Sequence, residues 1–263
     1  MQTKELTEIL EKAVARSAEN EKEVAIAFSG GLDSATIAKI GMQKFGAKLI
    51  AMGVEGSHDL AAAREAADEL GLPLYEVVLD ERKILQDYEV CYKMMPGTLT
   101  DVELMVGAYE CCKKAQELGC KIILFGSGAE ENFIGYQKYY NRFSKGEDLQ
   151  KILNKEIETL PSRDLKRTCA IAGHFGIKAA FPFMDKELVK EVASVPVEKR
   201  MGTVEMKKPL LRKIAKSLGV PKCAYERPKK AMQYGSDIHR ILLRHAKAKN
   251  IEFWDARAPF VYE

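Results

Sequence analysis

The chain has 263 residues, of which 46% are hydrophobic and 30% charged, and its formal net charge is only +3. This length suits one large domain or two small ones, and the apolar fraction suffices for a buried core. No apolar run reaches the ~18 residues of a membrane-spanning helix, and residues 4–12 are too charged for the apolar core of a signal peptide. We therefore expect a cytoplasmic protein without a membrane partner.

The first half of the chain alternates between predicted strands and predicted helices. Apolar residues at helical spacing predict an amphipathic helix over 2–20. Apolar runs then predict four strands, over 23–28, 48–54, 74–79 and 120–125. Further helices are predicted over 34–45 with Gly46 as stop signal, over 60–70 with Ser57 or Asp59 as cap, from near Asp80, and from Thr98 or Thr100 to Leu118. This alternation predicts a parallel α/β sheet, which binds ligands at the carboxyl ends of its strands.

The second half of the chain shows no strand pattern after Tyr140. Its apolar spacing instead suits helices, over 163–176, 185–195, 206–218 and 236–248. We expect an α/β nucleotide-binding region over 1–145 and a mostly helical region over 146–263, packed on the same active site. The aromatic tail over 253–263 is expected to dock by packing.

The first predicted strand runs into a glycine turn, Ser29-Gly30-Gly31-Leu32-Asp33-Ser34, that opens a helix. Such a turn collects backbone N–H groups and a helix N-terminus at one point, and this point binds phosphate. Both glycines are expected to adopt positive φ, while the serines add hydroxyl donors. Asp33 would repel a phosphate unless a divalent cation lay between them, so Asp33 predicts Mg²⁺. A plain turn between strand and helix is the alternative.

The fourth predicted strand ends in a similar turn, from Gly126 to Tyr136, which contains Glu130 and Glu131. In a parallel sheet this turn should lie near the first one, and its carboxylates suit Mg²⁺ ligation together with Asp33. The alternative is that the two glutamates only favour the positive end of a helix dipole.

These turns carry a resemblance to a known family. The first turn resembles the pyrophosphate loop (PP-loop) of the N-type ATP pyrophosphatases, and the second resembles the Gly-x-Gly-x-Asp-Glu-x-x-Gly-Gly-Tyr segment of the asparagine synthetase synthase domain. Further segments resemble that domain in the same order, at 56–60, 163–167, 176–185, 207–212 and 227–235. The resemblance covers about residues 22–245. It implies a parallel-sheet PP-loop ATP pyrophosphatase fold, like that of the adenine nucleotide alpha hydrolases, with a helical C-terminal part.

The resemblance also implies a reaction and its residues. ATP would adenylate a small-molecule carboxylate with release of pyrophosphate, and ammonia or an amine would then displace AMP. Pyrophosphate and Mg²⁺ would be bound by the first turn, that is Ser29, Gly30, Gly31, Leu32, Asp33 and Ser34. Val54 and Gly126 would border the adenosine, and Arg227 would help to hold the phosphates. The implied catalytic residues are Lys229, which would neutralise the charge that develops as pyrophosphate leaves, and the metal ligands Asp33 and Glu130.

Three departures from the family pattern limit what the resemblance implies. The family's enzymes begin with a glutamine-hydrolysing domain, whereas this chain reaches its first strand by Val24. Nitrogen is therefore expected from free ammonia or from a separate glutaminase chain. Ser127 stands in the place of a catalytic glutamate, Glu130 is one methylene longer than the family's aspartate, and Ala179 replaces an arginine. ATP activation is expected to be retained, while aspartate as the acceptor is left open, as is the contact of Asp59 with substrate.

Two other functions compete with the ligase. The same loop could serve sulfur insertion or tRNA modification, which the excess of basic residues between 199 and 249 supports. Against this reading, the six cysteines include no Cys-x-x-Cys pair, and we expect mostly buried thiols. The chain could also be a nucleotide-binding module without catalysis. A homo-oligomer is possible, and the sequence does not decide it.

Overall fold

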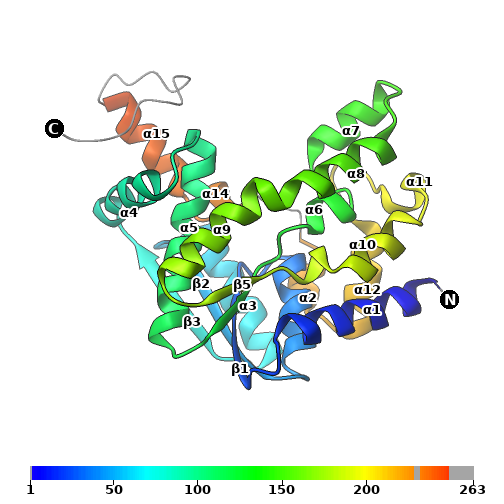
Figure 1. Ribbon diagram of the computed structural model, residues 1–263, viewed down its shortest axis with the longest axis horizontal. Helices are drawn as coiled ribbons and strands as arrows, with labels where there is room; N and C mark the ends of the chain where they lie inside the picture. Colours follow the sequence, from blue (N-terminus) through cyan, green and yellow to red (C-terminus); the bar gives the residue numbers. More distant parts are fainter. Residues whose placement is uncertain (1, 228–231, 249–263) are drawn as a thin grey trace.

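The computed structural model describes residues 2–227 and 232–248, and it contains a parallel sheet of five strands (Figure 1). The strands are β1 Glu23–Ala27, β2 Gly46–Val54, β3 Leu74–Leu79, β4 Ile122–Leu124 and β5 Lys178–Ala180, in the spatial order β3-β2-β1-β4-β5. Every paired neighbour is parallel. The predicted parallel α/β architecture is therefore confirmed, and the four predicted strands all form.

The fifth strand corrects the expectation that no strand follows Tyr140. β5 pairs with β4, with Ile122 opposite Lys178 and Leu124 opposite Ala180. It is only three residues long and contains two alanines, so neither an apolar run nor an alternating pattern marks it in the sequence. Its backbone pairing with β4 holds β5 in the sheet.

Helices cover both faces of the sheet. Before β4 they are α1 Gln2–Ser17, α2 Leu32–Gly41, α3 His58–Leu70, α4 Glu81–Met94 and α5 Leu99–Glu117. After β4 they are α6 Ala129–Asn132, α7 Gln137–Ser144, α8 Leu149–Thr159, α9 Asp164–His174, α10 Lys186–Ala193, α11 Val197–Arg200, α12 Pro209–Leu218, α13 Lys222–Tyr225, α14 Met232–Gly235 and α15 Ile238–Ala248, with 3-10 turns at Leu160–Ser162 and Pro182–Met184. The helical character predicted for the second half is confirmed for its described residues.

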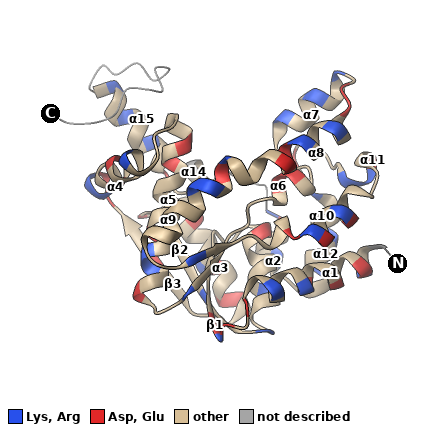
Figure 2. Ribbon diagram, in the orientation of Figure 1, with Lys and Arg blue, Asp and Glu red and all other residues tan. Residues whose placement is uncertain are grey.

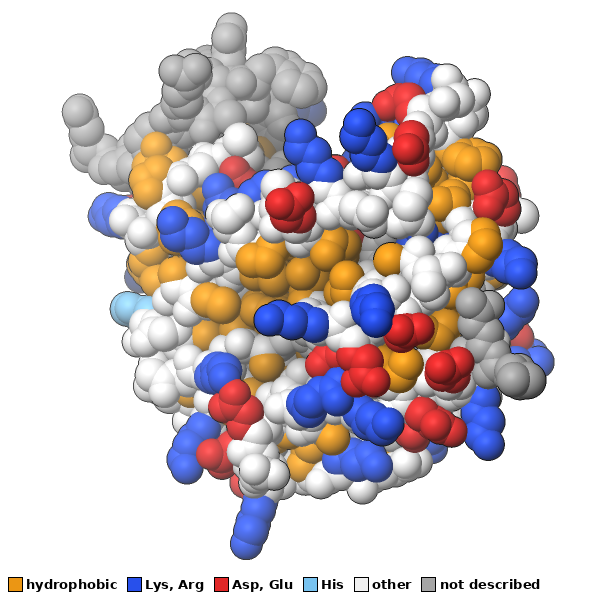
Figure 3. All heavy atoms as spheres, turned by 45° about the vertical axis from the view of Figure 1, so that its right-hand side comes forward, with side chains coloured by type: hydrophobic (Ala, Val, Ile, Leu, Met, Phe, Trp, Pro, Cys, Tyr) orange, Lys and Arg blue, Asp and Glu red, His pale blue; other side chains and the backbone are white. Residues whose placement is uncertain are grey.

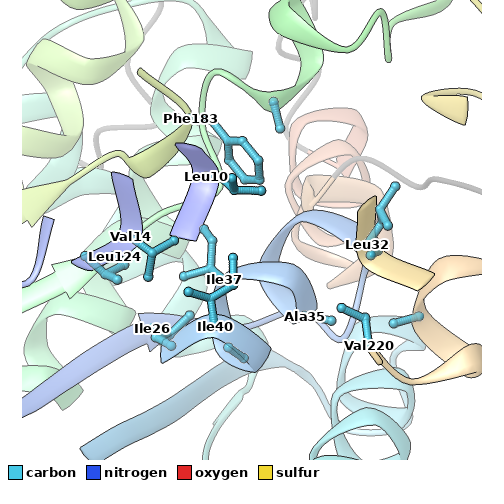
Figure 4. Close-up of a cluster of buried hydrophobic side chains, with 14 of the residues drawn as sticks. Leu10, Val14, Ile26, Leu32, Ala35, Ile37, Ile40, Leu124, Phe183 and Val220 are labelled. Atoms are coloured by element: carbon cyan, nitrogen blue, oxygen red, sulfur yellow. The ribbon is translucent and has the colours of Figure 1, made fainter. Parts of the chain in front are cut away.

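The two faces of the sheet carry separate hydrophobic clusters because side chains alternate along a strand. On β1, Val24 and Ile26 join one cluster and Ala25 joins the other. The first cluster contains residues of α1, α2, α3, α10 and α12, and the second contains residues of α4, α5, α9 and α15. Figure 4 shows part of the first cluster, in which Leu10 and Val14 of α1 lie near Ile37 of α2. Helices from the second half of the chain thus complete both layers.

Helix boundaries follow local signals, with two corrections. Thr98 accepts a hydrogen bond from the Asp101 amide and forms a capping box at the start of α5, as one of the two predicted starts required. Gly46 is not the stop of α2, which ends at Gly41; it is the first residue of β2. Asp59 is not the cap of α3, because Ser57 precedes the helix and Asp59 lies in its first turn.

Two expectations, the division into regions and the docking of the C-terminal tail, stay predictions. The division into regions 1–145 and 146–263 is one of them, although β5 and the second-half helices share the sheet and its clusters. The docking of the aromatic tail over 253–263 lies outside the described residues. Within the described residues, no helix combines the length and apolarity that crossing a membrane requires.

Candidate active site

The first glycine turn connects β1 to α2 in close contact with α3. Gly30 has φ +64°, and a Cβ added to it would lie 2.2 Å from the carbonyl oxygen of Ala62, so no other residue fits here. Gly31 corrects the prediction, because its φ of −84° is open to any residue. The turn is closed from within, since the Ser29 amide donates to Ser34 Oγ (3.3 Å) and Ser34 Oγ donates to the Gly31 carbonyl (3.2 Å).

The second glycine turn lies directly against the first. A Cβ added to Gly126 would be 3.2 Å from the Cβ of Asp33, a tight contact that shows how closely the two turns approach. Gly128 follows with φ +93° and leads into α6. Asn132, buried at the end of α6, donates through Nδ2 to the carbonyls of Gly128 (3.0 Å) and Phe183 (2.7 Å). These bonds fix the turn to the segment after β5, so the strand that the sequence did not reveal helps to build the site.

One buried lysine joins the two turns. Lys208 Nζ donates to both carboxylate oxygens of Asp33 (2.9 and 2.7 Å) and to Oε1 of Glu130 (2.8 Å). Lys208 is only 2% exposed. Asp33 and Glu130 are therefore brought together as predicted, and Lys208 is a site residue that sequence reasoning missed. The Lys-x-hydrophobic-Leu-Arg resemblance at 207–212 was the only signal that could have identified it.

The backbone at Lys208 is strained. Lys208 has φ +60° and ψ +46°, in the left-handed region, and it is the N-cap residue of α12. For a residue with a Cβ this conformation costs roughly 1–2 kcal/mol. Such strain persists where the surroundings determine the conformation, which is common at functional sites. Here the strained turn is the one that directs the lysine at the two carboxylates.

Only a glycine fits beside this lysine. A Cβ added to Gly135 would lie 1.7 Å from Glu130 Oε2 and 2.3 Å from Lys208 Cε. The Gly135 amide also donates to the Glu130 carbonyl at 2.8 Å, which folds the chain back over α6. The residue before it, Ile134, is buried and has φ +58°, unusual for a β-branched side chain. The second half of the turn is thus shaped around the Lys208–Glu130 contact.

A basic pocket opens beside the two turns. It is lined by Ser29, Gly31, Leu32, Asp33, Asp59, Lys207, Lys208, Arg212, Ala224 and Arg227. Arg227 Nη2 donates to the Ser29 carbonyl (3.2 Å), and Arg212 Nε donates to the Lys207 carbonyl (2.6 Å) while its Nη1 donates to that of Tyr225. Burial lowers the pKa of both arginine side chains below its usual value. Four cationic side chains at a glycine turn make this pocket suitable for a polyanion.

Two further predicted residues, Val54 and Asp59, contact the segment from α14 to α15, and Asp59 also lines the pocket. Val54 is the last residue of β2, and its amide donates to the Ser236 carbonyl at 3.0 Å. Asp59 is 6% exposed and lies against the backbone of Gly235, where an added Cβ would be 2.2 Å from Asp59 Oδ1. The segment from α14 to α15 therefore contacts the carboxyl end of β2 and the first turn of α3. Lys229, the predicted catalytic lysine, lies outside the described residues.

The two neighbouring glutamates of the second turn have different environments. Glu130 accepts from Lys208, whereas Glu131, the next residue of α6, is 4% exposed with its pKa raised to about 7 chiefly by burial. Four cysteines, Cys91, Cys111, Cys112 and Cys120, are buried as expected. Burial raises the pKa of the Cys111 thiol to about 12, which makes it a poor nucleophile. Ala179, which stands where the family has an arginine, is buried in β5 and brings no charge to the site.

The arrangement of Asp33 and Glu130 fits a divalent cation. Oxygens of both carboxylates lie within 2.9 Å of one ammonium nitrogen, so they already surround a positive charge. Carboxylate oxygens are also the protein ligands that Mg²⁺ takes, usually one or two of them together with substrate phosphates. Asp33 and Glu130 are accordingly the residues that would hold the ion.

Comparison with known proteins gives a family match and relatives with similar sequences. A family model described as asparagine synthase matches residues 5–151 and 141–252. A putative glutamine-hydrolysing asparagine synthetase 1 of Methanocaldococcus jannaschii is 29% identical over 92% of this chain, and the glutamine-hydrolysing asparagine synthetase B of Escherichia coli is 27% identical over 79% of it. The chain spans 51% and 40% of the length of these relatives. An NH3-dependent NAD synthetase structure from Campylobacter jejuni covers 100% of both chains, with 16% identity and a TM-score of 0.48.

Proposed function

The chain belongs to the asparagine synthase family, and from this premise we propose that it is an ATP-dependent ligase that adenylates a carboxylate and passes the acyl group to ammonia or an amine. The observation that carries the proposal is the meeting of two glycine turns over Asp33 and Glu130, beside a pocket with four cationic side chains. Nucleotidyl transfer needs a phosphate-binding turn, a pair of carboxylates that can bind a metal ion, and cationic side chains that stabilise the developing negative charge.

The first turn is proposed to hold the leaving pyrophosphate. Its backbone N–H groups and the N-terminus of α2 favour an anion, and Ser29 and Ser34 supply hydroxyl groups. Arg227, whose guanidinium already contacts the Ser29 carbonyl, would neutralise the phosphates from the other side. As an acceptor carboxylate oxygen bonds to the α phosphorus, the bond to the β phosphate oxygen breaks, and the charge that leaves falls among these groups.

Magnesium is proposed to be held by Asp33 and Glu130. When bound, Mg²⁺ supplies charge neutralisation for the nucleotide phosphates. The chain's own contribution is to orient its ligands: Gly126 brings the second turn against Asp33, and Gly135 leaves Glu130 the space to face it. Adenosine is proposed to lie at the carboxyl ends of the central strands, against Val54 and Gly126.

The direct test is pyrophosphate release from ATP over a panel of carboxylates, first with ammonium and then with sulfide. We expect AMP and pyrophosphate in equal amounts, formed only when an acceptor is present, together with the amide product. Formation of ADP and phosphate, or no turnover with any acceptor, contradicts the ligase. The sulfide reactions separate it from a sulfur-inserting enzyme, which would release pyrophosphate with sulfide and not with ammonium.

Lys229 is proposed as the catalytic lysine. Lys229→Ala should lower the rate of pyrophosphate release by about 10²–10³-fold, because one preorganised donor to the developing charge is removed. Lys216→Ala, an exposed change on α12, is the matched control and should leave the rate unchanged. A variant that loses only some nucleotide affinity would indicate a binding module instead of an enzyme.

The second candidate function is tRNA modification through the same adenylation step. The observation in its favour is the excess of basic residues between 199 and 249. In Figure 2, α15, which lies within this stretch, carries Lys and Arg, whereas α1 and α10, which lie outside it, carry side chains of both charges. Binding of tRNA that falls steeply with salt would support this alternative, since phosphate contacts release counterions.

The nitrogen source is proposed to be free ammonia or a separate glutaminase chain. Figure 3 shows apolar side chains gathered in the middle of one face, between charged residues, which is the kind of surface that a partner chain buries. Amide formation with ammonium alone would establish the first source. Formation only with glutamine and a glutaminase would establish the second.

A further inference from the structure

The three donors of the Lys208 ammonium are all engaged with carboxylate oxygens. An ammonium group has three N–H bonds and no acceptor, and Lys208 Nζ makes three hydrogen bonds, two to Asp33 and one to Glu130. Both acids come from turns that the chain brings together from distant parts of the sequence. The same position between two carboxylates is the one that a divalent cation would favour.

The surroundings of Lys208 direct its ammonium at the two carboxylates. Lys208 is 2% exposed, and its side chain passes Gly135, where even a Cβ would come within 2.3 Å of its Cε. Its backbone is held in the left-handed region directly before Pro209. Burying a charged group has a large free-energy cost unless the group is paired. The pairing of Lys208 with two carboxylates offsets this cost.

We propose that Lys208 is an internal counter-cation, which holds Asp33 and Glu130 together while no nucleotide is bound and gives up its place to the metal when the nucleotide enters. The inference rests on the proposed function for the identity of that metal, and it concerns the order of binding. Metal alone must displace a fully hydrogen-bonded ammonium. Metal carried by a nucleotide brings phosphate oxygens, to which the ammonium can transfer its hydrogen bonds.

The pocket supplies the space for this exchange. Lys208 is one of the residues that line it, together with Ser29, Arg212 and Arg227. A small rotation of the lysine side chain toward the first turn would exchange carboxylate acceptors for phosphate acceptors, with no net change in the number of charged hydrogen bonds. Lys208 is thus a positioning residue for the metal ligands before the reaction starts.

The test uses nucleotide-free protein and Mn²⁺ as the probe, with free Mn²⁺ measured by electron paramagnetic resonance. Lys208→Met should bind Mn²⁺ at least ~10-fold more tightly than the wild-type protein, because a cation that competes for both carboxylates is gone. Lys213→Met, an exposed lysine on the same helix α12, is the matched control and should match the wild-type protein. A residue that only packs would leave Mn²⁺ affinity unchanged or lower it when removed, so either result in folded Lys208→Met protein overturns the proposal.

If Lys208→Met does not fold in metal-free buffer, circular dichroism replaces the affinity measurement. Recovery of the folded spectrum on addition of Mn²⁺, without recovery by the same concentration of potassium, supports the proposal, and absence of recovery overturns it. Mn²⁺ affinity of nucleotide-free protein is independent of turnover. A tighter Mn²⁺ site in a chain that forms no pyrophosphate with any acceptor would therefore refute the ligase and leave the counter-cation standing.

Discussion

Gly135 occupies the position at which the candidate metal site has the least space. The side chains of Glu130 and Lys208 leave no space for a side chain at this position, since an added Cβ would lie 1.7 Å from a carboxylate oxygen of Glu130. Gly135→Ala should displace Glu130 and lower pyrophosphate release by about 10–100-fold, as is typical when the support of a metal ligand is lost. Gly173→Ala, in α9 with no atom near the added Cβ, is the matched control. Equal rates for both variants would contradict the assigned site.

Glu131 gives a prediction for pH. Burial raises its pKa from 4.5 to about 7, so between these values the folded protein holds a proton that the unfolded chain releases. Stability therefore falls as the pH rises through this window. Glu131→Gln should be more stable than the wild-type protein at pH 8, by up to ~3 kcal/mol, and the difference should vanish toward pH 4.5. Urea unfolding at both pH values measures it.

The control for this prediction is Glu158→Gln. Glu158 is exposed on α8, so this variant should show no pH-dependent difference from the wild-type protein. Other groups that titrate in the same range are present in all three proteins and cancel in the comparison. A Glu131→Gln variant that is less stable at pH 8 would mean that the charged carboxylate is stabilised in the fold.

At the scale of single residues, the sequence predicts acids better than it predicts their partner. Glycine turns mark Asp33 and Glu130 in the sequence. No local pattern marks Lys208, because it is one of 41 lysines and arginines and nothing nearby in the sequence distinguishes a buried one. Its burial depends on Gly135, Glu130 and Asp33, which reach it only through the tertiary fold.

Among the elements, α5 is the longest helix of the described residues, and it packs on the face of the sheet that carries the second cluster. Thr98 starts it through two reciprocal bonds, in which the Asp101 amide donates to Thr98 Oγ1 (3.2 Å) and the Thr98 amide donates to Asp101 Oδ2 (2.9 Å). Thr98→Ala should lower the free energy of unfolding by about 1 kcal/mol, because a donor of the first turn loses its acceptor.

Urea denaturation followed by far-UV circular dichroism measures this loss. Thr100→Ala provides the comparison, since Thr100 is exposed within the helix and alanine has the higher helix propensity. It should be neutral or slightly stabilising. Equal losses for both variants would show that the capping box does not stabilise α5.

Elements were predictable where a local signal exists and not where pairing decides. The four strands with apolar runs, and the helix that starts at Thr98, follow from their own residues. β5 does not, because three residues with two alanines have no pattern of their own and form a strand only beside β4. The same holds for Gly46, which the sequence predicts as a helix stop and which is instead the first residue of β2.

For the whole molecule, α1 connects the beginning of the chain with its second half. Arg16 of α1 donates to both carboxylate oxygens of Asp185 (3.0 and 2.8 Å), and Leu10 is completely buried in the first cluster. Leu10→Ala should destabilise the protein by about 2–5 kcal/mol, through lost burial and the cavity that remains. Calorimetry should still show a single transition, because both halves share the sheet and its clusters.

Lys12→Ala is the matched change on the exposed side of α1 and should leave the melting temperature nearly unchanged. Two separate transitions in Leu10→Ala would instead mean that the regions 1–145 and 146–263 unfold independently. The meeting of the two turns was predictable at this scale, since parallel strands end at one edge of the sheet. The entry of Lys208 from the second half was not, because no rule of sheet topology directs a helix there.

The bond between Val54 and Ser236 bears on how this protein would tell one purine from another. The single amide of Val54 is already committed to the Ser236 carbonyl, and its carbonyl accepts from the amide of Ser57. A ring nitrogen that needs a donor will therefore find none in the backbone of Val54, whose side chain can only offer shape. Choice between adenine and guanine would fall to other groups around the nucleotide, and a screen of base analogues should look for its determinants there.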